Sequence, residues 1–368
     1  MKKLFFFSIL FLSLQVSFAQ VKYKKWSDIN TTRFGNEVIY TDKDDQPLNG
    51  DYKLSERSGA FNEMSFINGK PNGKTKIYDS FNNLILEGAY KDGLPHGKIT
   101  EYFQNGNIQK ESNFIDGKKD GTWKEFDKKG EVRVVENYKN DKKDGKWTQR
   151  LKNAETGEMF TETKFYKTGI ATGKWTSITD DGVTMWEKDY KNNSDYTKKE
   201  YYPNAKLRSL EIFLDYKKNG ICEYYNQNGI LLYKSHYNAG YPTKKEIYFE
   251  NGVLKEVFNY KNGFKDGKYT YFDELGTLQV EGSYKTDYRD GLWIYYNDDG
   301  SKAKTFNYKN DVKDGLSQTF NEAGTIEREG QYKNDQKQGL WKVYKLNGNL
   351  KKEIEYKNDN IITEKEYK

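Results

Sequence analysis

The amino-acid sequence predicts an all-β protein, an extended and twisted antiparallel meander of stacked β-hairpins. Three observations lead to this prediction: aromatic residues that recur every 24 residues, short runs of β-favouring residues, and turn-forming pairs that end in glycine. No stretch shows the sustained 3.6-residue apolar period that would indicate a helix. The chain has 368 residues, but a repeat array grows by adding units, so this length does not require several separate cores.

The period is clearest towards the C-terminal end, where one aromatic position and two glycine positions repeat together. A fixed period in this range indicates stacked units that each pack on their neighbours. Thirteen aromatic positions follow the period, which predicts about thirteen repeats of about 24 residues. The strictest copies are Tyr260, Tyr284, Tyr308, Tyr332 and Tyr356, then Gly267, Gly291, Gly315 and Gly339, then Gly276, Gly300, Gly324 and Gly348.

Each unit predicts two short strands and two turns. Runs such as Tyr269-Thr270-Tyr271-Phe272 and Trp293-Ile294-Tyr295-Tyr296 favour strands. Asp-Gly pairs such as Asp266-Gly267 and Asn-Gly pairs such as Asn251-Gly252 bound these runs. Because tight hairpin turns need positive φ, we expect both kinds of pair to form hairpin turns.

The spacing also predicts the organisation of the chain. Residues 1–19 form a signal peptide, residues 20–49 a cap, and residues 50–368 the array. Within the array, the repeats are strict over 66–145 and 260–356, and the centre, 146–259, is irregular. Four extra residues fall in that centre, around Ala154, Glu155, Thr156 and Gly157.

The first 19 residues predict export. Lys2 and Lys3 precede an apolar run of about eleven residues, and small residues end at Ala19, where we expect cleavage. The run is too short to span a bilayer, and no later segment is apolar enough to do so, so no transmembrane segment is expected. The mature chain would therefore act in the periplasm or outside the cell.

Composition limits the classes of partner. Without Lys2 and Lys3 the formal charge falls from +6 to +4, with both signs interleaved, which is not the footprint of a nucleic-acid-binding protein. The 31 Tyr, 21 Phe and 7 Trp argue against disorder, since such chains are poor in aromatic residues. A single cysteine, Cys222, excludes an intramolecular disulfide.

Two aromatic ladders run through the array. The first lies two residues after the turn glycine and the second three residues later, which places the two on opposite faces of a strand. One interpretation is cross-strand packing; the other is an exposed stripe that grips a ligand such as a glycan. The first ladder includes Trp147, Trp175, Trp293 and Trp341.

The sequence offers little for catalysis. Only two histidines occur, His96 beside a turn glycine and His236 in a predicted strand. No nucleophile triad, metal-binding helix motif or phosphate-binding loop is found, so we expect neither an enzyme nor a cofactor or metal.

The repeat resembles the MORN repeat, and more closely its bacterial variant. The segment Tyr260 to Lys268 is similar to the family's Tyr-x-x-Gly with a second glycine, and Glu281-Gly282-Ser283-Tyr284 is similar to its Glu-Gly element. The departure is Gly121-Thr122-Trp123, a Gly-x-Trp where the standard form has Gly-x-Gly. The resemblance implies a twisted sheet of stacked hairpins that serves as a scaffold. Some standard members are linked to phospholipids, and similar bacterial variants are labelled antitoxin components.

We therefore expect a non-enzymatic exported scaffold that binds a protein partner, with an immunity or antitoxin-like role as one form. The alternative is a module that binds glycan or the cell envelope through an exposed aromatic stripe. A phospholipid surface ranks third because basic residues are not clustered. The candidate binding residues are Trp147, Ala154, Glu155, Thr156, Gly157, Trp175, Trp293 and Trp341.

Overall fold

The computed structural model describes residues 20–35 and 37–368, and they form β-strands joined by short turns. The only helical segment in this part of the chain is a single 3₁₀ turn, η1 (Trp26–Asp28). The all-β prediction is confirmed. The predicted signal peptide, residues 1–19, lies outside the described residues.

The chain divides into two compact units, which are described separately. The first contains residues up to Arg150 together with Tyr166–Gly169, and the second contains Leu151–Phe165 and Ile170–Lys368. The division passes through two strands, β15 (Gly145–Lys152) and β16 (Met159–Lys167).

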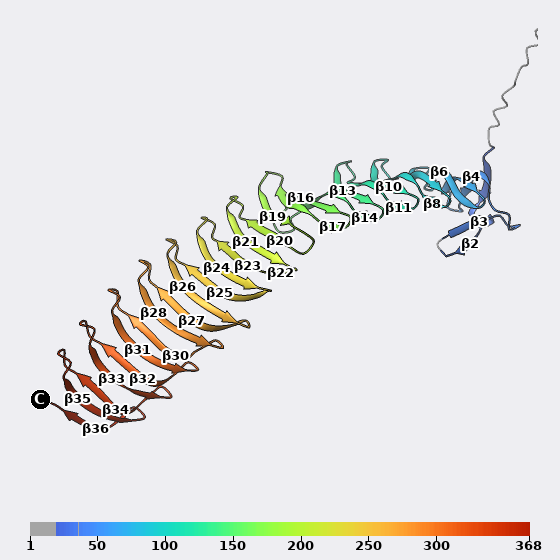
Figure 1. Cartoon of the computed structure of the whole chain (residues 1–368). Helices are drawn as coiled ribbons and strands as arrows, with labels where there is room; N and C mark the ends of the chain where they lie inside the picture. Colours follow the sequence, from blue (N-terminus) through green and yellow to red (C-terminus); the bar gives the residue numbers. More distant parts are fainter. Residues whose placement is uncertain (1–19, 36) are drawn as a thin grey trace, which may run out of the picture. The chain divides into compact units, whose positions relative to one another are not determined.

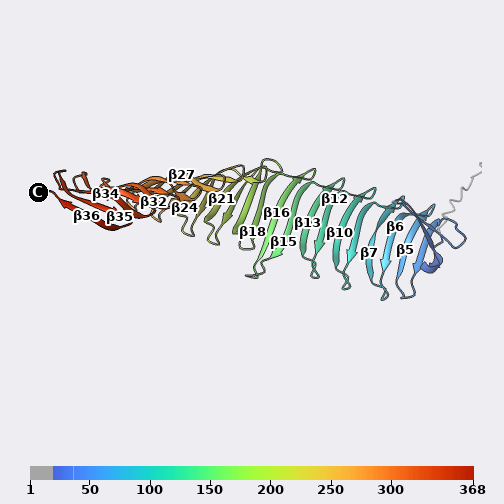
Figure 2. The ribbon, with the colours of Figure 1, turned by 90° about the horizontal axis from the view of Figure 1, so that it is seen from below.

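In the first unit consecutive strands pair antiparallel and lie side by side in one layer (Figure 2). Two additions sit at its N-terminal end: β1 pairs parallel with β4, and β2 and β3 form a separate hairpin. The strands are β1 (Lys22–Lys25), β2 (Asn30–Phe34), β3 (Glu37–Thr41), β4 (Gly50–Ser55), β5 (Phe61–Ile67), β6 (Lys70–Tyr78), β7 (Leu84–Lys91), β8 (Leu94–Pro95), β9 (Gly97–Tyr102), β10 (Ile108–Ile115), β11 (Lys118–Lys119), β12 (Gly121–Phe126), β13 (Val132–Lys139), β14 (Lys142–Lys143) and β15 (Gly145–Lys152).

The second unit is also an open antiparallel sheet of consecutive hairpins (Figure 1). Its strands are β16 (Met159–Lys167), β17 (Ile170–Ala171), β18 (Gly173–Thr179), β19 (Thr184–Tyr190), β20 (Tyr196–Tyr201), β21 (Leu207–Leu214), β22 (Lys217–Lys218), β23 (Gly220–Tyr225), β24 (Leu231–Asn238), β25 (Tyr241–Tyr248), β26 (Leu254–Lys261), β27 (Phe264–Phe272), β28 (Leu278–Lys285), β29 (Tyr288–Arg289), β30 (Gly291–Tyr296), β31 (Lys302–Lys309), β32 (Val312–Phe320), β33 (Ile326–Lys333), β34 (Gln336–Tyr344), β35 (Leu350–Lys357) and β36 (Asn360–Glu366).

The hairpins use a different turn at each edge of the sheet. At one edge a two-residue turn follows the repeating tyrosine, and both residues have positive φ, as with Asn310 at 50° and Asp311 at 68°. This is the type I′ geometry that matches the twist of the strands. At the other edge Gly300 donates its N–H to Asn297 O at 2.9 Å and has φ of 80°. The second set of glycines therefore lies in turns, as predicted.

The pair Asp266-Gly267, in contrast, is not a hairpin turn, and for this pair the prediction was wrong. Asp266 and Gly267 lie inside β27, at a bulge where the register against β26 shifts. Gly267 has φ of 101°, so it meets the same need for positive φ that a turn would impose. The side chain of Asn259 spans the bulge, donating from Nδ2 to Lys268 O at 2.7 Å.

A conventional buried core is small in both units. In the first, Leu48, Tyr52, Leu54 and Phe66 are buried beneath Trp26, Ile29, Tyr40 and Met64, where the N-terminal hairpin meets the array. In the second, Trp341, Ile354 and Tyr356 form such a cluster. Elsewhere stability depends on contacts between neighbouring strands.

Candidate binding surfaces

The first aromatic ladder is a packed row. Trp293 is 3% exposed, and its indole N–H donates at 3.1 Å to Ser283 O, which also accepts the N–H of Asp290 at 3.0 Å. The ring lies against Gly282, where a Cβ would be only 2.3 Å from Trp293 Cδ2. Gly330 stands in the same relation to Trp341 at 2.1 Å. In these repeats the tryptophan of the Gly-x-Trp element therefore packs against the glycine of the Glu-Gly element on the neighbouring strand.

The second ladder occupies the opposite face. The Tyr296 hydroxyl donates to Glu281 Oε1 at 2.6 Å, and Glu281 lies across from Ile294, the neighbour of Trp293. Burial, followed by this hydrogen bond, raises the pKa of Tyr296 to about 12. The same bond joins Tyr102 to Glu87 at 2.6 Å and Tyr344 to Glu329 at 2.7 Å.

Cations from the chain cover the rings of the first ladder. Arg289 lies 4.1 Å from the Tyr308 ring centroid and 5.8 Å from that of Trp293. Its Nε binds Asp311 of the next turn at 3.0 Å. Trp341, at 4% exposure, is covered in the same way by Lys337 at 5.2 Å. These contacts favour packing over ligand binding for Trp293 and Trp341, since each ring is enclosed by its own chain.

The row changes character in the irregular centre of the second unit. Lys188 pairs with Trp175 across the strands, Lys198 pairs with Lys188, and Glu211 pairs with Lys198. The strict repeats place aromatic rings or small residues at these positions. Burial, with Lys198 nearby, lowers the pKa of Lys188. Glu211 accepts hydrogen bonds from Lys218 Nζ at 2.6 Å and from the Tyr224 hydroxyl at 2.7 Å. Although burial opposes the effect, these bonds hold the pKa of Glu211 below its ordinary value.

Two adjoining hollows accompany this polar section. The larger, of about 470 Å³, lies where the turn of the insertion meets two neighbouring turns, and we call it the central groove. The smaller, of about 360 Å³, shares Glu200, Tyr202 and Arg208 with it. The smaller hollow is also lined by Ser209, which is 4% exposed and whose Oγ has no hydrogen-bond partner among the described residues. The central groove is lined by Asn153, Thr156, Glu158, Thr179, Asp181, Val183, Thr184, Met185, Trp186, Glu200, Tyr201, Tyr202, Pro203 and Arg208.

The insertion is an ordered turn beside this groove. Asn153 accepts N–H groups of Glu155 at 2.9 Å and Thr156 at 3.3 Å on its side-chain oxygen. Thr156 lines the groove, whereas Ala154, Glu155 and Gly157 are exposed but do not line it.

The remaining predicted residues, Trp147 and Trp175, are half-buried. Their indole groups donate to Asn137 O at 2.8 Å and Phe165 O at 3.0 Å, so they belong to the packed row and not to the groove. Sequence reasoning missed Trp186 and Arg208. Trp186 is a tryptophan at a sequence position that does not follow the 24-residue period, and this departure was the signal that could have drawn attention to it.

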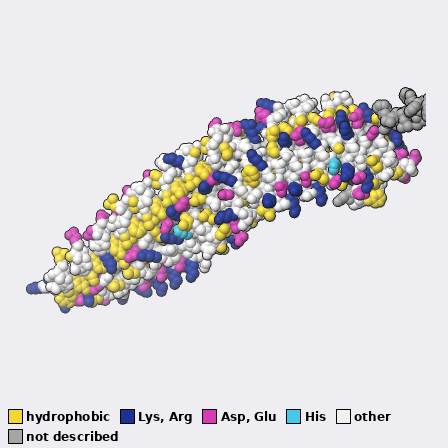
Figure 3. Space-filling view, turned by 45° about the horizontal axis from the view of Figure 1, so that its top comes forward, with side chains coloured by type: hydrophobic (Ala, Val, Ile, Leu, Met, Phe, Trp, Pro, Cys, Tyr) yellow, Lys and Arg dark blue, Asp and Glu magenta, His cyan; other side chains and the backbone are white. Residues whose placement is uncertain are grey.

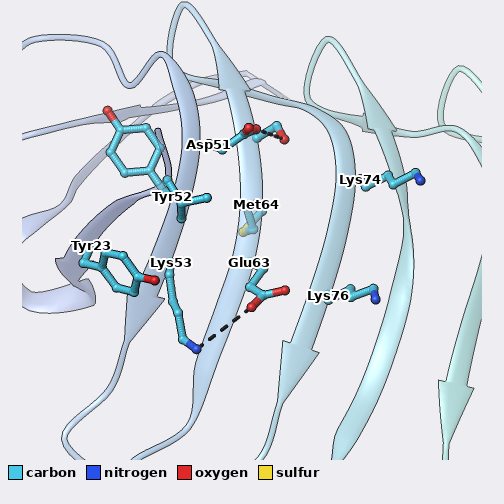
Figure 4. A pocket seen from close by; sticks show the side chains of 10 residues that line it. Tyr23, Asp51, Tyr52, Lys53, Glu63, Met64, Lys74 and Lys76 are labelled. Carbon is cyan, nitrogen blue, oxygen red and sulfur yellow. Dashed lines mark hydrogen bonds and ion pairs between the residues drawn. The ribbon is translucent and has the colours of Figure 1, made fainter. Parts of the chain in front are cut away.

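A third hollow, of about 360 Å³, lies in the first unit over β4, β5 and β6 (Figure 4). Some of its polar groups bind one another, whereas Lys74 and Lys76 line it without an ion pair among the described residues. Ser65 donates to Asp51 at 2.5 Å, and Lys53 lies 4.0 Å from Glu63 and 3.6 Å from the centre of the Phe61 ring.

The second unit also carries exposed apolar side chains at a repeating position. Leu292, Leu316 and Leu340 directly follow Gly291, Gly315 and Gly339, the glycines at the bulges. They are next to row residues and so on the opposite face, with exposures of 50%, 38% and 46%. We call these three the leucine row. In the first unit the same position holds Lys74, Lys98, Thr122 and Lys146. Figure 3 shows hydrophobic side chains gathered in a band along the second unit, with charged side chains beside it.

No group of three or more His, Cys, Asp or Glu side chains suited to a metal ion occurs within residues 20–35 and 37–368. Cys222 is buried in the row, His96 lies 3.2 Å from Asp116, and His236 lies 3.5 Å from Glu246. None of the helices in the described part of the chain is long and apolar enough to cross a membrane.

Comparison with known families agrees with this geometry. The profile of the MORN repeat variant matches eight segments, 95–116, 119–140, 218–239, 244–262, 265–286, 289–310, 313–334 and 337–358. The fold and the repeat therefore define a scaffold of stacked β-hairpins. The chain belongs to the MORN repeat variant family.

Other comparisons add little. No curated protein matches this chain. A solved structure described as "Crystal structure of the eukaryotic initiation factor" aligns over 92% of this chain and 87% of that chain, with 8% identity and a TM-score of 0.14. We draw no argument from it.

Proposed function

We propose that the protein is an exported, non-enzymatic scaffold that binds a protein partner through the leucine row. The observation that carries this proposal is the exposure of Leu292, Leu316 and Leu340 on one face of the sheet. They lie on alternate strands, roughly 9–10 Å apart. Exposed apolar side chains in a contiguous arrangement are typical of protein–protein contacts, because their burial against a partner removes apolar surface from water.

The strict repeat suits such a role mechanically. Asp311 N–H donates to Arg289 O at 3.0 Å, and Arg289 N–H donates to Asp311 Oδ1 at 2.8 Å, which ties each turn to the preceding one. The same pair of bonds joins Asp335 to Lys313 and Asp359 to Lys337. These fixed turns would hold the leucines at constant spacing, so that a partner meets a pre-organised surface and little ordering entropy is lost.

The test is capture of envelope proteins by the mature chain, with Leu316 and Leu340 both replaced by Lys. Lys268 holds the same position one repeat before Leu292, so lysine is compatible with the fold there. We expect the wild-type chain to retain one dominant protein and the double variant to lose most of it. The matched control is Thr122→Lys, at the same position in the first unit, which should retain the partner.

Two results would contradict the proposal. One is retention of the partner by the Leu316→Lys, Leu340→Lys variant. The other is loss of the partner only when residues 154–157 are deleted, which would move the contact to the central groove.

A glycan-binding role has weaker support. The sequence would place it on Trp293 and Trp341, but these rings are 3% and 4% exposed. A glycan array probed with the wild-type chain, and with Trp293→Phe as the control for packing, tests this alternative. An immunity or antitoxin-like role remains one form of the main proposal and depends on the identity of the captured protein.

A further inference from the structure

We propose that the central groove binds a lysine or arginine side chain of the protein partner, held between Trp186 and the carboxylates of Glu158 and Asp181. This inference depends on the proposed function in one respect, that the partner is a protein. It concerns a site different from the leucine row.

The first argument is the treatment of tryptophan elsewhere in the array. Five tryptophans each have a cation of the same chain within 6 Å of a ring. Among the described residues no Lys or Arg is placed over Trp186 in this way, although its side chain is half-buried and lines the groove. The five contacts are Lys119 on Trp123 at 4.2 Å, Lys143 on Trp147 at 4.3 Å, Lys164 on Trp175 at 5.9 Å, Arg289 on Trp293 at 5.8 Å and Lys337 on Trp341 at 5.2 Å.

The second argument is the charge of the groove. Glu158 and Asp181 line it, are exposed, and form no ion pair within the described part of the chain. In the strict repeat around Trp293 the cation over the ring is also bound by a carboxylate, since Arg289 binds Asp311 at 3.0 Å. The groove therefore presents the ring and the carboxylates of this arrangement and lacks its cation.

Two other charged residues line the groove. Glu200 is bonded to Lys198, and the guanidinium of Arg208 lies 5.9 Å from the Tyr202 ring centroid. Arg208 forms no ion pair within the described part of the chain, so one guanidinium faces the two unpaired carboxylates of Glu158 and Asp181. The net negative charge that remains makes the groove complementary to a positive side chain. A cation near an aromatic face and a carboxylate gains from both contacts, more so as water is excluded.

The adjoining hollow extends the site beyond a single side chain. Its Ser209 hydroxyl is buried and lacks a hydrogen-bond partner among the described residues, which is unusual for a buried polar group. Because the two hollows share Glu200, Tyr202 and Arg208, a chain whose basic side chain enters the groove would pass this hydroxyl. A peptide N–H or C=O placed there would complete its hydrogen bonding.

The experiment uses capped heptapeptides with random neighbours and a fixed central Lys, Arg, norleucine or Glu, passed over the immobilised mature chain. Norleucine keeps the four-carbon side chain of lysine and lacks its ammonium group. We expect Lys and Arg peptides to be retained about tenfold more than norleucine peptides, with Glu peptides lowest. The excess should shrink as salt is raised, because the contact is partly ionic.

The decisive variant carries Glu158→Gln and Asp181→Asn, which remove charge with almost no change in volume. It should lose the preference for Lys and Arg, as should Trp186→Leu. The matched control is Glu322→Gln, an exposed turn carboxylate of a strict repeat, which should keep the preference. Far-UV circular dichroism and melting curves confirm that each variant is folded.

Equal retention of Lys and norleucine peptides by the wild-type chain would overturn the inference. So would an equal loss with Glu322→Gln, or a sugar bound at the groove with no peptide preference. Failure of this inference can be distinguished from failure of the proposed function. Partner capture through the leucine row is measured with the Leu316→Lys, Leu340→Lys variant and does not depend on the groove.

Discussion

Replacing Gly282 by alanine should destabilise the array, although alanine is ordinarily the better residue in a strand. The backbone of Gly282 does not have positive φ, so the change tests space alone. A Cβ there would lie 2.3 Å from Trp293 Cδ2, 2.5 Å from Cε2 and 2.7 Å from Cγ. Real Cβ atoms do not approach carbon so closely, so the ring or the strand must move.

The magnitude follows from three contributions. Overpacking of this kind costs about 1–3 kcal/mol. Displacing the indole also weakens its hydrogen bond to Ser283, a loss of about 1 kcal/mol. The backbone entropy gained by replacing glycine with alanine returns about 0.5–1 kcal/mol. The net expectation is a destabilisation of roughly 1–3.5 kcal/mol.

The assay is urea unfolding followed by circular dichroism, with amide hydrogen exchange of β28 and β30 to localise the loss. Local readout is needed because repeat arrays do not always unfold in one step. In a Trp293→Ser background the same glycine replacement should cost much less, and serine is tolerated there because Ser317 holds the same place one repeat later. Unchanged stability of Gly282→Ala, or an equal loss in both backgrounds, would refute the reasoning.

Three further predictions concern the repeat and its export. Tyr296→Phe removes the hydrogen bond to Glu281 and should cost about 1 kcal/mol of stability. Because folding raises the pKa of Tyr296 to about 12, the contribution of this hydroxyl is complete below pH 10 and is lost as the pH rises towards 12. Urea unfolding midpoints measured across that pH range will check this. Asp311→Gly keeps positive φ but removes the acceptor for Arg289, so it should lower the melting temperature, whereas Asp311→Asn should not. Exported protein should begin at Gln20 by N-terminal sequencing, and a mature chain beginning at Met1 would contradict export.

Most of the fold could be predicted from the sequence because each unit repeats the same local contacts. The 24-residue period, the β-favouring runs and the second set of glycines all reflect contacts within one hairpin or with the next. The Asp-Gly pairs misled because a bulge and a hairpin turn make the same demand on the backbone: Gly267 at φ of 101° and Gly300 at φ of 80° are alike by that criterion. Only the strand pairing separates them, and it is not a local property.

The candidate site was less accessible to sequence reasoning. The insertion drew attention to the right neighbourhood, since Thr156 lines the central groove. Trp293 and Trp341 were chosen as binding residues, but their rings are packed. The sequence pattern cannot separate the two cases, because an aromatic residue in a repeat has the same spacing whether its ring is covered or free. Which rings are covered depends on cations such as Arg289, which precedes Tyr308 by 19 residues, and on a glycine in the neighbouring strand, as Gly282 is for Trp293.

The physical difference between the strict repeats and the centre explains why the hollows lie where they do. In the strict repeats a large ring of the row meets a small partner, as Trp341 meets Gly330 and Phe306 meets Ser317, so the surface is filled. In the centre, Lys198 and Glu211 take row positions and turn towards Glu200 and Lys218. A long polar side chain that reaches sideways to its partner fills less space above the strand than a ring does. The hollows therefore follow from replacing aromatic packing by ion pairs, and the proposed ligand site lies where the array has fewer packing contacts of its own.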